Sequence, residues 1–203
     1  MPVRTPATTV ALPIWVALVL WALAALCLGG LLVLRHKVPL PESELSAKDV
    51  QAAISRTRED DEAGKWLAVH FLYEECGCSA RVLDSLLRHP AGKDVAERIV
   101  LVTDGSTHPP VERRARELGY GFVSLSRERA TEQYQVQAVP VLAILSPTNA
   151  LQYFGGYQRK RGPVLEDRDL IRRARAGDAI PPLPTFGCAI GRRLAARANP
   201  LNL

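Results

Sequence analysis

Cysteine and methionine are scarce in this chain. The few cysteines argue against a disulfide-rich scaffold, and the single methionine limits the possible metal ligands. Four cysteines in 203 residues are too few to staple a small disulfide-rich scaffold. The single methionine is the first residue, so the rest of the chain offers no thioether ligand for copper. No internal repeat is visible. The length leaves room for one domain of roughly 130 residues, which is large enough to bury its own core.

Aromatic residues are also missing where positive charge gathers. The formal net charge is +5, and from residue 158 onward ten Lys and Arg face four Asp and Glu, with only Phe186 interleaved. Because stacking on bases needs aromatic side chains, we expect no nucleic-acid partner. The basic, proline-containing segment 179–203 is predicted to be a solvated C-terminal tail, with contact to anionic lipid as the alternative.

Charge is absent altogether from Val10 to Leu34, a run of 25 residues. As a helix this run would span about 37 Å, against a hydrocarbon core of about 30 Å. The polar sequence RHKVPLPESE follows it, and not the small-residue cleavage site of a signal peptide. We therefore predict a tail at 1–9, one transmembrane helix at 10–34 and a linker at 35–46. Cys27, inside the run, is expected to act as a small hydrophobic residue.

The rest of the chain alternates between strand patterns and helix patterns. Strands are predicted at 66–73, 98–104, 121–125, 140–146 and 151–156, and helices at 47–63, from the cysteines to about Pro90, at 109–119, 128–134 and 165–176. The turn SPTNA joins the last two strands. Strands that alternate with helices and end in an adjacent pair make an α/β fold with a mixed sheet. We place this domain at residues 47–178.

Two features of the domain narrow the fold. Cys76 and Cys78 lie between a buried strand and the start of a helix, where loops collect function. About sixty residues later, Pro140 follows Val139 and opens another buried strand. This combination resembles the thioredoxin fold, in which strand, cysteine motif and helix are followed by a cis-proline. The resemblance implies that Pro140 is cis and packs against Cys76, and that Val139 offers its backbone to a bound partner chain.

Longer stretches extend the resemblance. The segment RATEQYQVQAVPVLAILSPTNALQYFGGY resembles membrane-anchored, TlpA-like thioredoxin proteins. CGCS at 76–79, FGGYQRKRG at 154–162 and FGC at 186–188 are similar to the motifs of the RedB-type branch, which pairs Cys-Pro-Cys-Ser with a later GG…RG segment and an FGC. This chain departs from that pattern by having Gly77 in place of the proline, and the sequence after Gly162 matches poorly.

The Cys-Gly-Cys spacing leaves the chemistry open. Ser79 stands where the commoner motif has its resolving cysteine, and it is a candidate helix cap. A Cys76–Cys78 disulfide would close a small ring that Gly77 makes possible, and its strain would make the bond easier to reduce. Cys188 could resolve a disulfide at either cysteine, act as a third metal ligand, or be an unpaired buried cysteine.

The sequence contains one feature that favours a thiolate at the cysteine motif and one that opposes it. A helix N-terminus favours a thiolate by about 0.3–1 kcal/mol. Glu74 and Glu75 oppose it, because an exposed like charge at about 4 Å costs about 1 kcal/mol even in water. The sequence alone therefore does not establish a reactive thiol.

We expect a membrane-anchored thiol–disulfide oxidoreductase that exchanges disulfides with protein thiols through Cys76 and Cys78 and needs no cofactor. Cys188 is expected as a further catalytic residue, and Val139 and Pro140 as the residues that bind the substrate chain. A redox-silent domain that only binds a partner is one alternative.

The other alternative is a soft-metal module. A Cys-x-Cys pair suits Cu(I), with His70, His89 or Cys188 completing the ligand set. We expect His70 to be a core histidine and His89 a surface residue, and hence no metal site.

The orientation in the membrane rests on two opposed arguments. Arg35 and Lys37 outnumber Arg4 across the apolar run, which slightly favours a cytoplasmic domain. The usual setting of the proteins that the chain resembles favours export. We expect a single-pass inner-membrane protein with a periplasmic or otherwise extracytoplasmic domain.

Overall fold

The chain divides into two compact units between Val38 and Pro39. The computed structural model describes residues 13–37, 39–40, 47–160, 162 and 165–198. The first unit holds helix α1 (Ile14–Lys37), which covers most of the run predicted at 10–34, while residues 10–12 lie outside the described residues. Among the described residues, no helix combines the length and the apolar character that a bilayer crossing requires.

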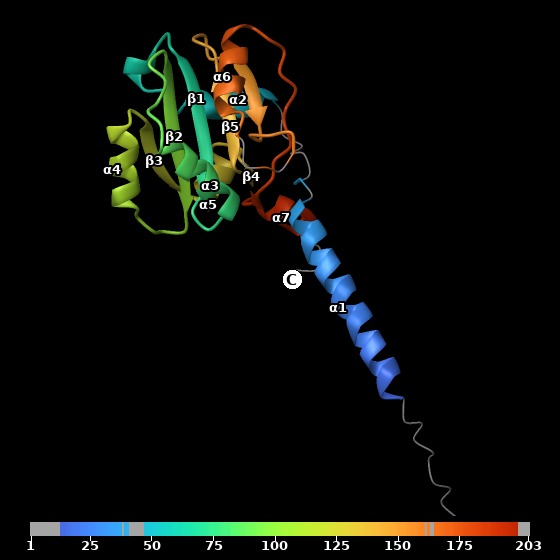
Figure 1. Ribbon diagram of the computed structural model, residues 1–203. Coiled ribbons are helices and arrows are strands. Elements are labelled where there is room, and N and C mark those ends of the chain that lie inside the picture. Colours follow the sequence, from blue (N-terminus) through green and yellow to red (C-terminus); the bar gives the residue numbers. More distant parts are fainter. Residues whose placement is uncertain (1–12, 38, 41–46, 161, 163–164, 199–203) are drawn as a thin grey trace, which may run out of the picture. The chain divides into compact units, whose positions relative to one another are not determined.

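Five strands form the central sheet of the second unit. They are β1 (Trp66–Tyr73), β2 (Val95–Thr103), β3 (Gly121–Ser126), β5 (Val141–Leu145) and β6 (Leu151–Gly155), in the order β3-β2-β1-β5-β6. The first three run parallel, and β5 is antiparallel to both β1 and β6 (Figure 1). The sheet is therefore mixed, as predicted, and the strand predicted at 66–73 is confirmed at both ends.

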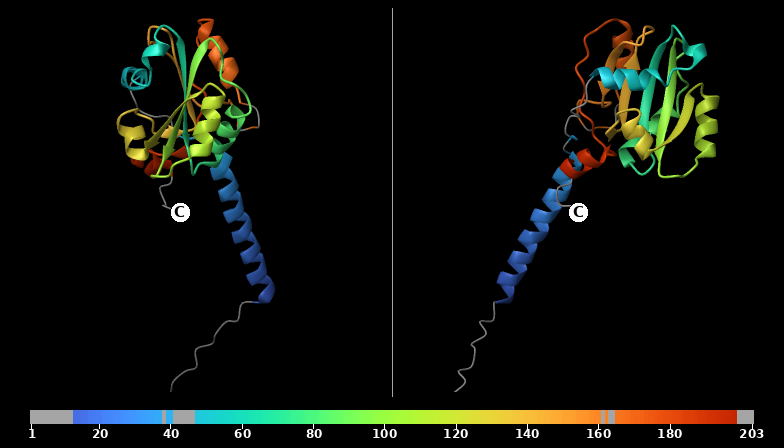
Figure 2. Two further views of the ribbon diagram at one scale, coloured as in Figure 1. Left: turned by 90° about the vertical axis from the view of Figure 1, so that its left-hand side faces the viewer. Right: turned by 180° about the vertical axis from the view of Figure 1, so that it is seen from behind.

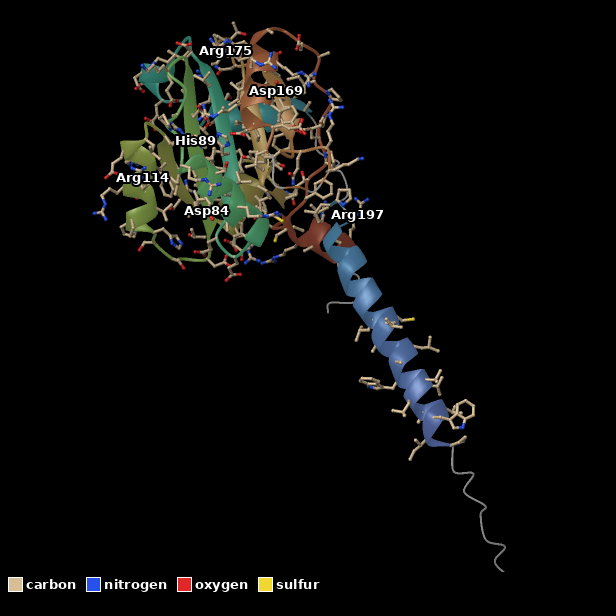
Figure 3. All side chains as sticks on the ribbon, in the orientation of Figure 1. Asp84, His89, Arg114, Asp169, Arg175 and Arg197 are labelled. Atoms are coloured by element: carbon tan, nitrogen blue, oxygen red, sulfur yellow. The ribbon has the colours of Figure 1, made fainter. Side chains whose placement is uncertain are left out.

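Helices cover both faces of this sheet (Figures 1 and 2). One face packs against α3 (Gly77–Leu86), α4 (Pro109–Glu117) and α6 (Asp167–Arg175), and the other against α2 (Ala47–Ser55) and α5 (Arg127–Glu132). Because successive strand residues point to opposite faces, Ala68 and Leu72 enter the first layer, while Val69 enters the second. Arg114 on α4 points away from the sheet into solvent (Figure 3).

The helix predicted at 47–63 is too long. Helix α2 ends at Ser55, and only a single 3-10 turn (Asp60–Glu62) follows it. The hydroxyls of Ser55 and Thr57 donate to the Ala52 and Ile54 carbonyls at 3.0 and 2.7 Å, and such back-bonding competes with helix continuation.

The segment predicted as a solvated tail folds back onto the domain. It forms β7 (Cys188–Ala189), which pairs antiparallel with β4 (Ala138–Val139), and then α7 (Arg192–Ala198). Helix α6 is therefore not the last helix. Leu183, Ile190 and Leu194 are buried. Burying these apolar side chains removes them from water, which stabilises the segment against the domain. We call residues 183–191 the docked segment.

Glycine allows the docked segment to approach the sheet closely. The Gly156 amide donates to the Leu183 carbonyl at 2.9 Å, and the Leu40 amide donates to the Thr185 carbonyl at 2.8 Å. A Cβ on Gly156 would overlap the carbonyl oxygen of Pro184. The backbone can pass at this distance only where no side chain intervenes.

We predict that Leu142→Ala lowers the free energy of unfolding by about 2–5 kcal/mol, because it removes a fully buried side chain from the strand next to β1. Chemical denaturation followed by circular dichroism measures this. The exposed Arg113→Ala on α4 serves as the control and should change stability by less than about 0.5 kcal/mol. Equal effects for the two variants would contradict the core assignment.

Candidate functional site

Cys76 caps the N-terminus of α3. Its backbone is extended (φ −97°, ψ 111°), and its carbonyl accepts the first bond of the helix, from the Ala80 amide at 2.9 Å. The Cys76 amide donates to the Tyr73 carbonyl at 3.1 Å, which turns the chain from β1 into the helix. The side chain is only 1% exposed. The structure therefore buries one of the two thiols through which the sequence predicts disulfide exchange.

The peptide bond between Val139 and Pro140 is cis, and it lies beside Cys76. The Cys76 sulfur lies 4.0 Å from the Val139 carbonyl oxygen. Both Val139 and Pro140 are buried. The cysteine motif and the proline, 64 residues apart in the sequence, therefore meet at one place.

Cys188 reaches the same place from the docked segment. In the β4–β7 pairing Cys188 stands opposite Val139, and its side chain is hydrogen-bonded to that of Cys76. This hydrogen bond lowers the pKa of the Cys188 thiol, against smaller opposing effects of burial and of the nearby Cys78. All four cysteines of the chain are in the thiol form. Cys188 is thus the thiol that ionises more readily than an ordinary cysteine.

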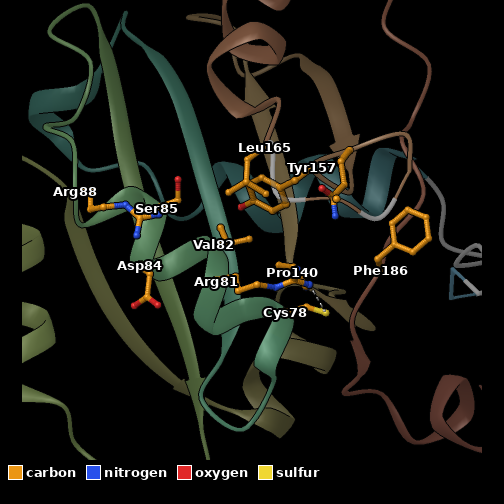
Figure 4. Close-up of a pocket in the computed structure, with 12 residues that line it drawn as sticks. Cys78, Arg81, Val82, Asp84, Ser85, Arg88, Pro140, Tyr157, Leu165 and Phe186 are labelled. Atoms are coloured by element: carbon orange, nitrogen blue, oxygen red, sulfur yellow. Dashed lines mark hydrogen bonds between the residues drawn. The ribbon is translucent and has the colours of Figure 1, made fainter. Parts of the chain in front are cut away.

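Cys78 lies at the same end of α3 but is more exposed than Cys76. It lies in the first turn of α3, partly exposed, with the Arg81 guanidinium nitrogen 3.5 Å from its sulfur. A positive charge at this distance stabilises negative charge on sulfur. Figure 4 shows the Arg81 side chain reaching toward Cys78 and Pro140, while Asp84 points away from them.

The cavity beside Cys78 has a volume of about 450 Å³. Its walls combine apolar side chains with polar and charged ones, which come from Arg81, Asp84, Ser85, Arg88 and Gln158. The apolar lining comes from Val82, Pro140, Tyr157, Leu165 and Phe186. Its size lies within the range of small-ligand sites, and it gives Cys78 an approach from solvent that Cys76 lacks.

The two glutamates before the cysteines have hydrogen-bond partners in the loop between β2 and α4 and at the end of β1. Glu74 accepts from the Asp104 amide and lies 2.7 Å from His108 Nε2. The Asp104 backbone hydrogen bond is the largest cause of the lowered pKa of Glu74, with burial opposing it. Glu75 accepts from the Tyr73 hydroxyl at 2.7 Å. The lowered pKa keeps Glu74 ionised, so its negative charge remains beside the cysteine motif.

Three other residues singled out in the sequence lie outside this cluster. Ser79 does not cap α3, because Cys76 occupies the N-cap position, and its buried hydroxyl has no hydrogen-bond partner among the described residues. His70 is a core histidine, as predicted: it is fully buried between Tyr157 and Glu97, at 3.0 and 3.4 Å. His89 lies exposed at the end of α3. Within the described ranges no group of three or more His, Cys, Asp or Glu is placed to hold a metal ion.

Sequence reasoning missed Arg81 and Gly187. Arg81 gave no signal, because an arginine on the first turns of an amphipathic helix is common. Gly187 lies within the FGC motif, and the structure shows why this position requires glycine. A Cβ on Gly187 would overlap the Val139 carbonyl oxygen and lie 2.6 Å from Pro140 Cδ. Only glycine lets the strand carrying Cys188 come this close.

No family model matches the chain, and no curated protein matches it. Similar solved structures include an uncharacterized conserved protein from Geobacillus kaustophilus, at 21% identity over 65% of this chain and 79% of that one, with a TM-score of 0.49. A hypothetical protein from Sinorhizobium meliloti shows 19% identity over 76% and 90%, with a TM-score of 0.48. A secreted disulfide oxidoreductase of Mycobacterium tuberculosis shows 14% identity over 57% and 84%, with a TM-score of 0.36.

At these identities and TM-scores the likenesses carry no functional weight. The chain's own elements show the fold class: a mixed sheet flanked by helices on both faces, with a cysteine motif at the first helix after β1. This arrangement matches a thioredoxin-like α/β fold.

We predict that Cys76→Ala raises the pKa of Cys188, because it removes the hydrogen bond that lowers it. The thiolate fraction of Cys188 should then fall at every pH below the ordinary thiol pKa of about 8.5. Cys76→Ser keeps a hydroxyl donor and should keep the lowered pKa. Ultraviolet thiolate absorbance against pH, in a background carrying Cys27→Ser and Cys78→Ser, measures both. Identical titrations of the Ala and Ser variants would show that Cys76 does not set this pKa.

Proposed function

We propose that the domain is a thiol–disulfide oxidoreductase that exchanges disulfides with protein substrates through Cys76 and Cys78, with Cys188 as a third catalytic thiol. The observation that carries the proposal is the convergence of three thiols at the N-terminus of α3, beside the Val139–Pro140 bond. A buried structural cysteine needs no second thiol beside it, whereas disulfide exchange needs one thiol to attack and a second to resolve the mixed disulfide.

The reaction runs in two exchanges. The Cys76 thiolate attacks one sulfur of a substrate disulfide, so that bond breaks and one substrate thiolate leaves. A second thiolate of the protein then attacks the Cys76 sulfur of the mixed disulfide and releases the other substrate thiolate. The substrate disulfide is reduced to two thiols, and two protein thiols are oxidised to a disulfide. The reverse sequence donates a disulfide to the substrate.

Cys188 is the favoured resolving thiol while the docked segment is in place. The β4–β7 pairing holds it opposite Val139, beside the Cys76 side chain, and its thiolate is the attacking species. Cys78 serves when the docked segment is away, because it lies two residues from Cys76 on the open side of the site, with Arg81 stabilising negative charge on its sulfur. Val139 and Pro140 form the wall of the groove against which the substrate chain lies.

We further propose that residues 10–34 anchor the domain in the inner membrane, with the domain outside the cytoplasm. The support is the charge-free run of 25 residues in the sequence and the compartment that the chemistry requires, because disulfides persist in oxidising environments. The sequence offers no comparable support for a nucleic-acid partner.

Thiol counting in a defined redox buffer tests the exchange. We expect the full chain to lose and regain a pair of thiols reversibly and to reduce a protein disulfide such as that of insulin. Cys76→Ser should abolish both. Cys188→Ser should leave a slower activity through Cys78, and Cys78→Ser should leave the Cys188 route. Cys27→Ser, remote in sequence from the site, is the matched control and should behave like the parent chain.

Two other results would contradict the proposed function and favour one of the alternatives. A thiol count that does not change reversibly would favour a redox-silent domain that binds a partner. Retention of Cu(I) through dialysis, lost together in Cys76→Ser and Cys78→Ser, would favour the soft-metal module. Neither result is expected.

The anchor predicts that the full chain stays with membranes after alkaline extraction. Leu20→Asp with Leu23→Asp should move a large share of the chain to the soluble fraction, because each charge near the centre of a spanning helix costs about 2.5–3.5 kcal/mol. Leu20→Ile with Leu23→Ile is the matched control and should stay membrane-bound. A parent chain found in the soluble fraction would contradict the anchor, and a reporter fused after Leu203 that works only in the cytoplasm would contradict the orientation.

A further inference from the structure

The docked segment occupies the edge of β4 as a partner strand would. Cys188 and Ala189 pair antiparallel with Val139 and Ala138, and the Ile190 and Gly191 amides both donate to the Gln137 carbonyl, at 2.9 and 3.0 Å. Addition of an extended chain to a free strand edge is a common mode of peptide recognition. Here the chain supplies that peptide itself.

The seated strand also presents a cysteine to Cys76. The Cys188 side chain is hydrogen-bonded to Cys76, and Cys76 is only 1% exposed. A substrate sulfur cannot reach Cys76 from the β4 side while Cys188 holds this position. The nucleophile of the proposed reaction is therefore shielded by a cysteine placed where the sulfur of a substrate would lie.

The residues around Cys188 show what the groove accepts. The residue before the cysteine must be glycine, because a Cβ there would overlap the Val139 carbonyl oxygen. The residue before that glycine, Phe186, lines the cavity beside Cys78 together with Tyr157 and Leu165. Two residues after the cysteine, Ile190 is 3% exposed. The occupant thus has the pattern apolar–Gly–Cys–x–apolar in an extended conformation.

We propose that the docked segment is a tethered mimic of the substrate, and that the substrate is an extended protein segment with an apolar residue and glycine immediately before its reactive cysteine. This inference rests on the proposed function and specifies its substrate class. The substrate segment displaces β7, pairs with β4, and brings its disulfide sulfur to Cys76. When β7 returns, Cys188 attacks the Cys76 sulfur of the mixed disulfide, the bond to the substrate breaks, and the released substrate leaves as a thiolate.

The test uses full chains in which Cys76 is the only cysteine, obtained with Cys27→Ser, Cys78→Ser and Cys188→Ser. The probes are two peptides, PTFGCAIG and PTFACAIG, whose cysteine is joined in a mixed disulfide to thionitrobenzoate. Attack by Cys76 on the peptide sulfur forms a peptide–protein disulfide and releases the coloured thionitrobenzoate. The rate of colour release is measured for each peptide.

Gly187→Ala opens the groove in this background, because the added Cβ prevents β7 from seating. Gly191→Ala is the matched control in the same segment, since its Cβ meets only the flexible side chain of Gln137. Circular dichroism and thermal unfolding establish that both variants are folded. We expect the opened chain to react with PTFGCAIG about tenfold faster than the control, because a short tether holds the mimic at an effective concentration in the millimolar range.

In the opened chain we expect PTFGCAIG to react about tenfold faster than PTFACAIG, because the Ala peptide meets the same backbone overlap. Equal rates for the two peptides, with Cys76 reactive toward the symmetric thionitrobenzoate disulfide, would overturn the inference and leave the proposed function standing. No reaction of Cys76 with either peptide or with that disulfide would instead overturn the proposed function. If Gly187→Ala fails to fold, the Gly-against-Ala peptide comparison in the unopened chain decides, with the same ratio expected at lower rates.

Discussion

The pairing of two short strands, β4 and β7, sets the chemistry of this site. It places Cys188 opposite Val139 and in hydrogen-bond contact with Cys76, although 112 residues separate the two cysteines in the sequence. The pairing depends on Gly187, because no other residue fits between β7 and the Val139–Pro140 bond. The low exposure of Cys76 and the lowered pKa of Cys188 both accompany this close approach. The three cysteines that the sequence names as catalytic candidates therefore lie close together in the folded chain.

The three thiols differ in access and in charge stabilisation, and this division suits exchange. Cys76 is buried at the helix N-terminus. Cys78 opens on a cavity with a guanidinium beside it. Cys188 has the readily formed thiolate, but it is carried on a segment held by few backbone hydrogen bonds to β4 and to residues 40 and 156. Short strand pairings of this kind belong to the low-stability end of a structure, so the docked segment is the element best placed to move during the reaction.

The sheet and most helices could be predicted from the sequence, because apolar runs such as WLAVHFLY and turn residues such as the SPTNA loop mark them directly. The meeting of Cys76 with Pro140 followed from resemblance to a known fold. The docked segment could not be predicted, because it lies in a stretch, 179–203, whose prolines and basic residues indicate a tail. The buried apolar residues of that stretch, Leu183, Ile190 and Leu194, are too widely spaced to show a period. The pKa of Cys188 and the hydrogen-bond partners of Glu74 depend on contacts between distant parts of the chain, which no local pattern contains.

The most direct test of the central claim is to map the disulfide that forms when the full chain is oxidised mildly. Proteolysis between Cys78 and Cys188, followed by mass spectrometry with fragmentation at Gly77, identifies the linked cysteines, with Cys188→Ser as the reference chain. We expect a Cys76–Cys188 bond to dominate in the parent chain and a Cys76–Cys78 bond to appear only when Cys188 is replaced. A Cys76–Cys78 bond as the main product in the parent chain, with Cys188 left as a thiol, would contradict the role assigned to the docked segment.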